Sequence, residues 1–151
     1  MTPYLIITDE MAHAMTLAAK RGVDVRIITP AFRTKKLIYS VTRSFYHELV
    51  KDGVRIYEWT PGFCHAKMSV ADDCMATCGT INLDYRSLYH HFENGCFMTD
   101  CDVVLDIRND LQEKMKECRE VTEKIPYRPQ CISSPEPAAY ETVCGIIIGK
   151  R

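Results

Sequence analysis

The sequence predicts an α/β fold in which a mixed β-sheet carries helices on both faces. Two observations lead to this prediction. Helical and strand periodicities alternate along most of the chain, and the composition suits a globular domain. The chain has 151 residues, of which 46% are hydrophobic and 26% are charged. This length is typical of one domain with a core of its own.

Two passes of helix followed by strand open the chain. Asp9–Arg21 places apolar residues on one helical face, with capping residues before it and a glycine after it. Val23–Thr29 is rich in β-branched residues and is predicted as a strand that a proline ends. Lys35–Lys51 repeats apolar residues at helical spacing, and Val54–Thr60 alternates as a strand.

A run of strands follows these two passes. Ala66–Ala71 and Met75–Gly79 are predicted to form a hairpin around a tight turn of two aspartates. Thr80–His91 has no clean period and is predicted as a loop or irregular segment, whereas Asn94–Met98 is predicted as a strand. These strands supply the mixed part of the sheet.

A long helix and a proline-rich segment are predicted to end the chain. Val103–Lys124 has apolar residues along one side and closes a domain that we assign to residues 1–124. Residues 125–151 hold four of the seven prolines and show little periodicity. We therefore expect this segment to be a poorly ordered tail.

Charge and hydropathy restrict the function classes. The net charge of −1 argues against a general nucleic-acid binder, although residues 1–67 sum to +4 and residues 68–151 to −5. No apolar run approaches the roughly 18–20 residues that cross a bilayer, and the start does not read as a signal peptide. The 151 residues are therefore expected to be soluble.

The eight cysteines do not predict a disulfide framework or a metal site. Disulfides would require export, and the cysteine spacings lack the paired Cys-x-x-Cys elements that zinc favours. We expect reduced, mostly buried thiols that pack as small hydrophobic groups. Neither a metal nor another cofactor is predicted.

Polar groups of distinct chemistry gather in the segment from His65 to Glu93. His65 and Lys67 are two apart, so a strand would direct both to one face, and the hairpin can return Asn82 to the same end. An imidazole can attack phosphorus and form a covalent intermediate, while an ammonium and an amide stabilise phosphate oxygens. Glu93 could hydrogen-bond the far ring nitrogen and orient His65. A histidine beside a lysine on a strand is nevertheless usually a surface pair.

The full string resembles a known signature. His65-x-Lys67-x4-Asp72-x6-Gly79-Thr80-x-Asn82 is similar to the HKD motif of the phospholipase D superfamily. The flanking stretches 53–67 and 79–93 resemble bacterial cardiolipin synthases, and this similarity extends over roughly residues 3–124. The fold that the resemblance implies is a phospholipase D-like half.

The resemblance also implies an activity and its partners. Cardiolipin synthases of this type place two HKD halves around one active site and carry N-terminal membrane spans. They transfer a phosphatidyl group between two phosphatidylglycerol molecules through a phosphohistidine. The residues here match the second, C-terminal motif. The expected partners are therefore phosphatidylglycerol, the N-terminal HKD half and, through the parent protein at the bacterial cytoplasmic membrane, the lipid surface.

Site roles carried over from the family fall on six residues. His65 is the nucleophile or the general acid, and Asp72 is a structural acceptor despite its place in the motif. The predicted catalytic residues are His65, Lys67, Asp72, Asn82 and Glu93, and the predicted substrate-binding residues are Lys67, Thr80 and Asn82. Asp84, Arg86 and Ser87 are expected to hold the loop that follows.

Two other functions stay open. Some superfamily members are short nucleases that join two copies of one motif, and a two-fold interface could bring two His65 side chains together in a homodimer. The near-neutral charge fits such a single-motif phosphodiesterase poorly, because basic surface strengthens nucleic-acid binding. A third function is a silent partner domain that binds lipid or the other half without turnover.

Overall fold

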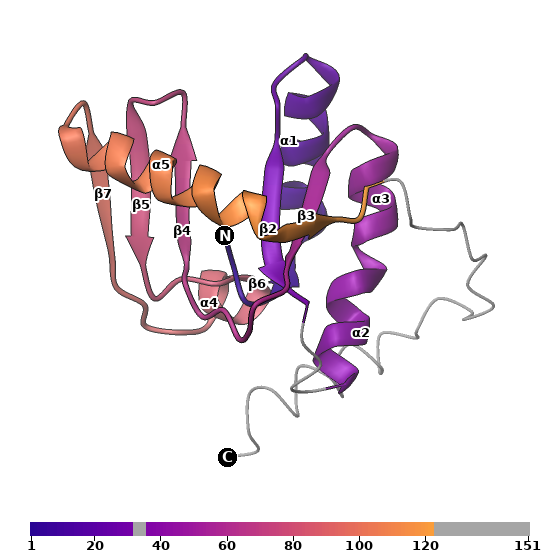
Figure 1. Cartoon of the computed structure of the whole chain (residues 1–151). Helices are drawn as coiled ribbons and strands as arrows, with labels where there is room; N and C mark the ends of the chain where they lie inside the picture. Colours follow the sequence, from indigo (N-terminus) through magenta and orange to yellow (C-terminus); the bar gives the residue numbers. More distant parts are fainter. Residues whose placement is uncertain (32–35, 123–151) are drawn as a thin grey trace.

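The computed structural model describes residues 1–31 and 36–122, which form a mixed α/β arrangement (Figure 1). Its strands make two three-stranded sheets and a short pair. One sheet has the order β2 (Arg26–Pro30), β3 (Arg55–Trp59) and β8 (Cys118–Glu120). The other has the order β4 (Met68–Ala71), β5 (Met75–Gly79) and β7 (Gly95–Thr99), and β1 (Leu5–Ile6) pairs with β6 (Leu83–Asp84). The β2–β3 and β1–β6 pairings are parallel and the others antiparallel, so the mixed sheet prediction is confirmed.

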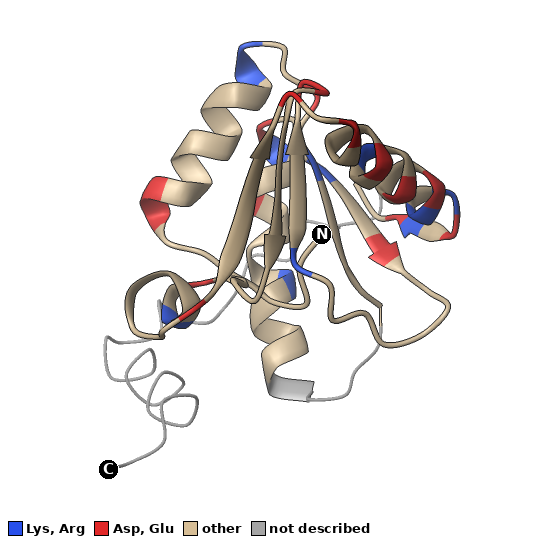
Figure 2. Ribbon diagram, turned by 90° about the vertical axis from the view of Figure 1, so that its left-hand side faces the viewer, with Lys and Arg blue, Asp and Glu red and all other residues tan. Residues whose placement is uncertain are grey.

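Helices lie on both sides of the layer of strands, as predicted. In Figure 2 the strands stand between α1 (Asp9–Lys20) on the left and α5 (Asp102–Lys116) on the right. Neighbouring residues of β2 point to opposite faces: Ile27 joins the core beneath α1, and Ile28 packs with Leu111 of α5. Each face of β2 therefore has a hydrophobic layer of its own.

The predicted helix Lys35–Lys51 is divided in the structure. α2 (Lys36–Ser44) and α3 (Tyr46–Lys51) are separated at Phe45, whose N–H bonds the Thr42 carbonyl three residues back. Ser44 Oγ donates to the Val41 carbonyl at 2.6 Å, a local bond that competes with the regular helical ladder. The break could not be predicted because the apolar residues keep helical spacing on both sides of it.

The predicted loop Thr80–His91 contains two short elements. β6 pairs with β1, and α4 (Tyr85–Tyr89) follows it directly. Asp84 caps α4, because its Oδ1 accepts from the Ser87 N–H at 2.7 Å. The prediction of a loop is wrong here, since a two-residue strand depends on a distant partner and a five-residue helix gives little periodicity.

The predicted helix Val103–Lys124 is too long. α5 ends at Lys116, and the next residues form β8 against the free edge of β3. The tertiary reason lies at Glu58, whose carboxylate is fully buried and accepts from Arg119 of β8. Strand β8 places Arg119 beside Glu58, and this tertiary contact outweighs the helical spacing of the local sequence.

The predicted tail at residues 125–151 lies outside the described residues. Within the described part, no helix combines the length and hydropathy needed to span a membrane. Six cysteines are described, all as free thiols, and only Cys64 among them is buried. The expectation of mostly buried thiols is therefore wrong for these six, because Cys78, Cys96 and Cys101 lie at exposed positions.

Candidate active site

His65 and Lys67 meet at the entrance to β4. Lys67 Nζ lies 2.9 Å from Nδ1 and 3.0 Å from Nε2 of His65, and it donates to the His65 carbonyl at 2.7 Å. The two residues are close because they are two apart in extended chain. His65 is exposed, and Phe63 stacks on its ring at a centroid distance of 5.7 Å. The pair places an imidazole and an ammonium together at a surface open to solvent.

The β4–β5 hairpin brings the second part of the motif beside this pair. The Gly79 N–H donates to the Lys67 carbonyl at 3.1 Å, which continues the hairpin pairing by one step. Gly79 also lies against β7: a Cβ added to it would stand 2.3 Å from the Asn94 carbonyl oxygen. Only glycine allows this approach of two backbones.

A chain of polar contacts extends from Thr80. Its hydroxyl donates to Glu93, and its Oγ1 accepts from the Asn94 N–H at 2.9 Å. Glu93 Oε1 lies 3.6 Å from His91 Nδ1, and Arg86 Nε donates to His91 Nε2 at 2.6 Å. The hydrogen bond from Thr80 lowers the pKa of Glu93, so this carboxylate stays ionised at neutral pH.

Asn82 is held by a hydrogen bond to Ser87, one of the residues expected to hold the loop. Its Nδ2 donates to the Ser87 hydroxyl at 3.1 Å, while its buried Oδ1 has no partner among the described residues. Asp84 in turn accepts from the Ser87 N–H, and Arg86 bonds His91, so the predicted role of these residues in holding the loop is confirmed. Turning the amide over would let Oδ1 accept from the Ser87 hydroxyl and free Nδ2 for an anionic oxygen.

Lys67 is partly withdrawn from solvent. Burial lowers its pKa, and the nearby carboxylates of Glu93 and Asp84 oppose this shift. Those carboxylates therefore favour the cationic form of Lys67 beside the imidazole.

The structure separates one predicted residue from the others. Asp72 follows β4, whereas His65 and Lys67 precede it, so about 16 Å of extended chain lies between Lys67 and Asp72. Within the described residues Glu93 accepts from the Thr80 hydroxyl, lies 3.6 Å from His91, and makes no hydrogen bond to His65. The orienting role of Glu93 and the catalytic assignments thus stay predictions.

The surface around the motif carries exposed apolar side chains that no sequence pattern indicates. Phe63 is 54% exposed, and Phe92, directly before Glu93, is fully exposed. Other exposed apolar side chains on neighbouring segments are Ile81, Tyr85 and Tyr89. In the sequence these residues are indistinguishable from core hydrophobics, because only the fold shows which of them stay uncovered. Among the described residues no group of His, Cys, Asp or Glu is arranged to hold a metal.

This fold is found in the phospholipase D superfamily. The structure resembles Nuc of Salmonella typhimurium, a phospholipase D family member, with a TM-score of 0.67 over 78% of this chain and 76% of Nuc. It also resembles NucT of Helicobacter pylori, with a TM-score of 0.58 over 78% of this chain and 77% of NucT. Sequence identity is 17% in both cases, so the likeness concerns the fold alone.

The sequence comparisons identify the family of this chain more narrowly than the fold does. Residues 1–115 match the family model described as "Cardiolipin synthase, PLD-like domain", and the chain belongs to that family. It is 36% identical to cardiolipin synthase 2 of Bacillus cereus over 120 residues, covering 80% of this chain and 23% of the relative. An uncharacterized protein of Streptococcus mutans is 52% identical over 122 residues, covering 81% of this chain and 26% of the relative. The chain thus spans about a quarter of the length of these relatives.

Proposed function

We propose that this chain is one catalytic half of a phosphatidyltransferase that makes cardiolipin from phosphatidylglycerol at a membrane. The observation that carries the proposal is the pair of His65 and Lys67, with the lysine nitrogen 2.9 Å from the imidazole at an exposed edge. This pair brings together a nucleophile and a cation suited to a phosphodiester. The missing histidine would come from a first HKD half.

The reaction divides into two displacements at phosphorus. In the first, a ring nitrogen of His65 forms a bond to phosphorus while the bond to the glycerol oxygen of the donor lipid breaks. The histidine of the other half gives a proton to that oxygen, and glycerol leaves. In the second, a hydroxyl of another phosphatidylglycerol attacks phosphorus, passes its proton back to the same histidine and releases His65.

Lys67 and Asn82 are suited to the charge that develops on the phosphate oxygens. Lys67 stands beside the imidazole, and the Asn82 amide would offer its Nδ2 as a donor if it were turned over, because Oδ1 could then accept from the Ser87 hydroxyl. Thr80 already bonds Glu93 and Asn94, so in this arrangement it positions the surrounding backbone and holds Glu93.

Three features support a lipid substrate and a second half. The named relatives that share 35–36% identity over 80–87% of this chain are cardiolipin synthases. Phe63 and Phe92 present apolar side chains next to the motif, where acyl chains or an apolar partner surface could cover them. His65 supplies one histidine, whereas the two displacements use two.

The test is a chimera in which this chain replaces the matching segment of Bacillus cereus cardiolipin synthase 2. We expect the chimera to form cardiolipin from phosphatidylglycerol vesicles and His65→Ala to lower the rate at least 10³-fold. His13→Ala, at an exposed position on α1, is the matched control and should leave the rate unchanged. An His65→Ala chimera that keeps most of its activity would remove His65 from the mechanism.

The isolated chain provides a second test. It should make little or no cardiolipin, because one half lacks the second histidine. Robust synthesis by a chain that sedimentation shows to be monomeric would contradict the half-enzyme proposal.

A single-motif phosphodiesterase acting as a homodimer is the second candidate. One observation favours it: His65 lies at an exposed position, where a two-fold interface could bring two copies of the motif together. This candidate predicts a dimer in solution and cleavage of bis(p-nitrophenyl) phosphate or DNA by the isolated chain, lost on His65→Ala. A monomer without such cleavage rejects it.

A further inference from the structure

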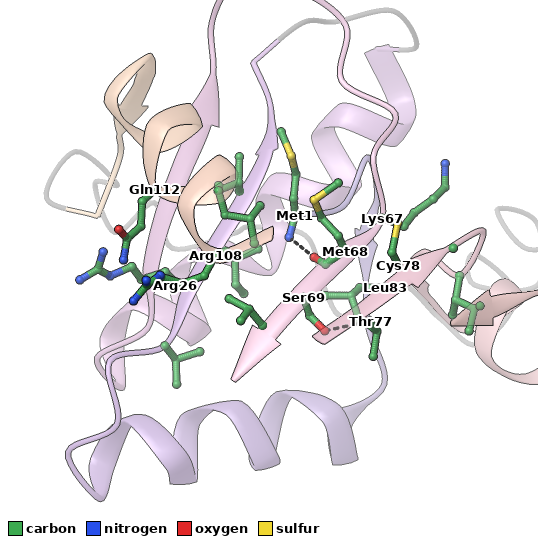
Figure 3. Close-up of a pocket in the computed structure, with 18 of the residues that line it drawn as sticks. Met1, Arg26, Lys67, Met68, Ser69, Thr77, Cys78, Leu83, Arg108 and Gln112 are labelled. Atoms are coloured by element: carbon green, nitrogen blue, oxygen red, sulfur yellow. Dashed lines mark hydrogen bonds between the residues drawn. The ribbon is translucent and has the colours of Figure 1, made fainter. Parts of the chain in front are cut away.

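Two cysteines lie directly opposite each other on neighbouring strands. Cys78 of β5 is the strand partner of Cys96 of β7, and both residues are exposed with free thiols. Opposed residues of a sheet direct their side chains to the same face. Both also line a cavity of about 580 Å³, where Figure 3 shows Cys78 near Lys67. We call these two cysteines the dithiol pair.

The backbone bonds on either side show that the dithiol pair is of the hydrogen-bonded kind. The Thr80 N–H donates to the Asn94 carbonyl at 2.8 Å, and the Asp100 N–H donates to the Cys74 carbonyl at 2.8 Å. Hydrogen-bonded pairs alternate along an antiparallel ladder, and the dithiol pair is an even number of steps from both of these. The Cα atoms of such a pair are about 5.5 Å apart, within the span of about 4.4–6.8 Å that a disulfide bridges. A disulfide can therefore form with the strand register kept.

The geometry favours a disulfide that is easily reduced. Opposed Cβ atoms lie about 4.5–5.5 Å apart, at the upper end in hydrogen-bonded pairs, whereas a disulfide holds them about 3.5–4.5 Å apart. The next pair supplies part of the approach, because a Cβ added to Gly79 would lie only 2.5 Å from Gly95 Cα. The remaining strain would make the bond labile, as in disulfides that open and close reversibly.

The other described cysteines lack this arrangement. Cys64 is buried, and burial raises the pKa of the Cys118 thiol to about 11, which leaves little of the reactive thiolate. The Cys74 thiol donates to the Ala71 carbonyl at 3.7 Å in the hairpin turn, and Cys101 precedes α5. Among the six described cysteines, only the dithiol pair combines exposure with a thiol directly opposite.

We propose that the dithiol pair is a reversible modification site, which small disulfides oxidise to a bridge between β5 and β7. One cysteine thiolate attacks a sulfur of the small disulfide, forms a mixed disulfide and expels the first small thiolate. The opposed thiolate then attacks the protein sulfur, forms the Cys78–Cys96 bond and expels the second. The two cysteine protons pass to the two small thiolates, so the protein is oxidised by two electrons and the small disulfide is reduced. The proposal does not depend on the phosphatidyl-transfer reaction.

The bridge would lie at the base of the candidate active site. Cys78 is also the strand partner of Met68, which follows Lys67 in the chain. Two pairs further along β5 and β7, the Thr80 N–H makes its bond to the Asn94 carbonyl. A covalent link this close would oppose separation of the strand ends, so we expect the Thr80 amide to exchange more slowly in the oxidised protein.

Peptide mapping of the full chain after incubation with oxidised glutathione tests this proposal. Trypsin places the two cysteines of the dithiol pair in separate peptides, 68–86 and 87–108. Each peptide holds one further cysteine, so the mapping uses the variant Cys74→Ser/Cys101→Ser, which keeps the dithiol pair. We expect most of the folded chain to yield the two peptides joined, and an excess of reduced glutathione to separate them.

The matched control is Cys78→Ser/Cys96→Ser, which keeps the other cysteine of each peptide. Its peptides should stay separate under the same treatment. Joined peptides in this control, equal joining in concentrated urea, or glutathione left on the unjoined cysteines of the dithiol pair would overturn the proposal.

Amide hydrogen exchange measures how the bridge acts on the motif. Oxidation of Cys74→Ser/Cys101→Ser should slow exchange of the Thr80 amide about threefold or more, and the control variant should not respond. An unchanged Thr80 amide in a chain with joined peptides would overturn the inferred hold on the active-site segment.

Discussion

Gly79→Ala should destabilise the fold strongly, because the position has no room for a side chain. Its Cβ would lie 2.3 Å from the Asn94 carbonyl oxygen and 2.5 Å from Gly95 Cα, whereas ordinary contact begins near 3.4 Å. One of the two backbones must therefore move by about 1 Å. The contacted atoms belong to the backbone, so no flexible side chain can move aside to make room. This movement would also stretch the bonds that Thr80 makes to Asn94 at 2.8 and 2.9 Å.

The expected size follows from these contacts. Overpacking of a well-packed site costs about 1–3 kcal/mol, and rigid backbone on both sides places this variant at the upper end. About 3 kcal/mol corresponds to a fall in Tm of roughly 10 °C for a domain of this size. Urea unfolding followed by circular dichroism and a calorimetric scan would measure both quantities.

Gly95→Ala is the matched control, since Gly95 is the cross-strand partner of Gly79. Its Cβ would meet Ile81 Cδ1 at 3.5 Å and the Cys78 carbonyl at 3.7 Å, which are ordinary contacts. We expect its free energy of unfolding to stay within about 1 kcal/mol of the wild-type value, helped by the lower entropy of the unfolded alanine chain. Equal losses in the two variants would refute the argument from close approach.

Three other predictions concern buried polar groups. Tyr46→Phe removes the phenol that shares a 2.6 Å hydrogen bond with Thr29, so urea unfolding should show a loss of about 1–2 kcal/mol that Thr29→Val partly restores in the double variant. Arg119→Met leaves the fully buried carboxylate of Glu58 with a more distant arginine, and should cost about 2–3 kcal/mol, less when combined with Glu58→Gln. Burial lowers the pKa of the Met1 α-amino group to about 6, below its ordinary value near 8. The unfolded chain then binds more protons between these values, so stability should rise from pH 6 to pH 8 by up to about 3 kcal/mol and level off above. This rise, measured by urea unfolding, should be absent from an N-acetylated chain.

The sequence predicted correctly those elements whose ends are marked by capping or turn residues. The helix predicted over Asp9–Arg21 and the hairpin strands around residues 72–73 lie where expected, because capping residues and turn residues set their limits. β1, β6 and β8 have two or three residues each, and their partners lie far away in the sequence. Strands this short exist only through tertiary pairing, so no local pattern announces them.

The contacts of the candidate site also fall into those that the sequence predicted and those that it did not. The motif spacing predicted that His65, Lys67 and the segment after Gly79 would meet, and the hairpin brings them together. The link from Arg86 through His91 to Glu93 was not predicted, because it depends on how α4 turns the chain back. The cavity of about 580 Å³ lined by residues of β2 and β4 was not predicted either, because a cavity depends on several elements at once.

The hairpin explains why the motif has its spacing. Lys67 and Gly79 are cross-strand partners, and equal arms from each reach the turn at Asp72 and Asp73. Both aspartates adopt positive φ, of 50° and 58°, a conformation that Asp tolerates better than most residues. Asp72 thus lies far from the imidazole and still bears on the site, because the turn sets the register that carries Gly79 to Lys67. Inserting one residue into either arm would turn the side chains that follow to the other face and separate the cation from the Thr80 segment. The spacing of the motif therefore records the length of a hairpin as well as the chemistry at its open end.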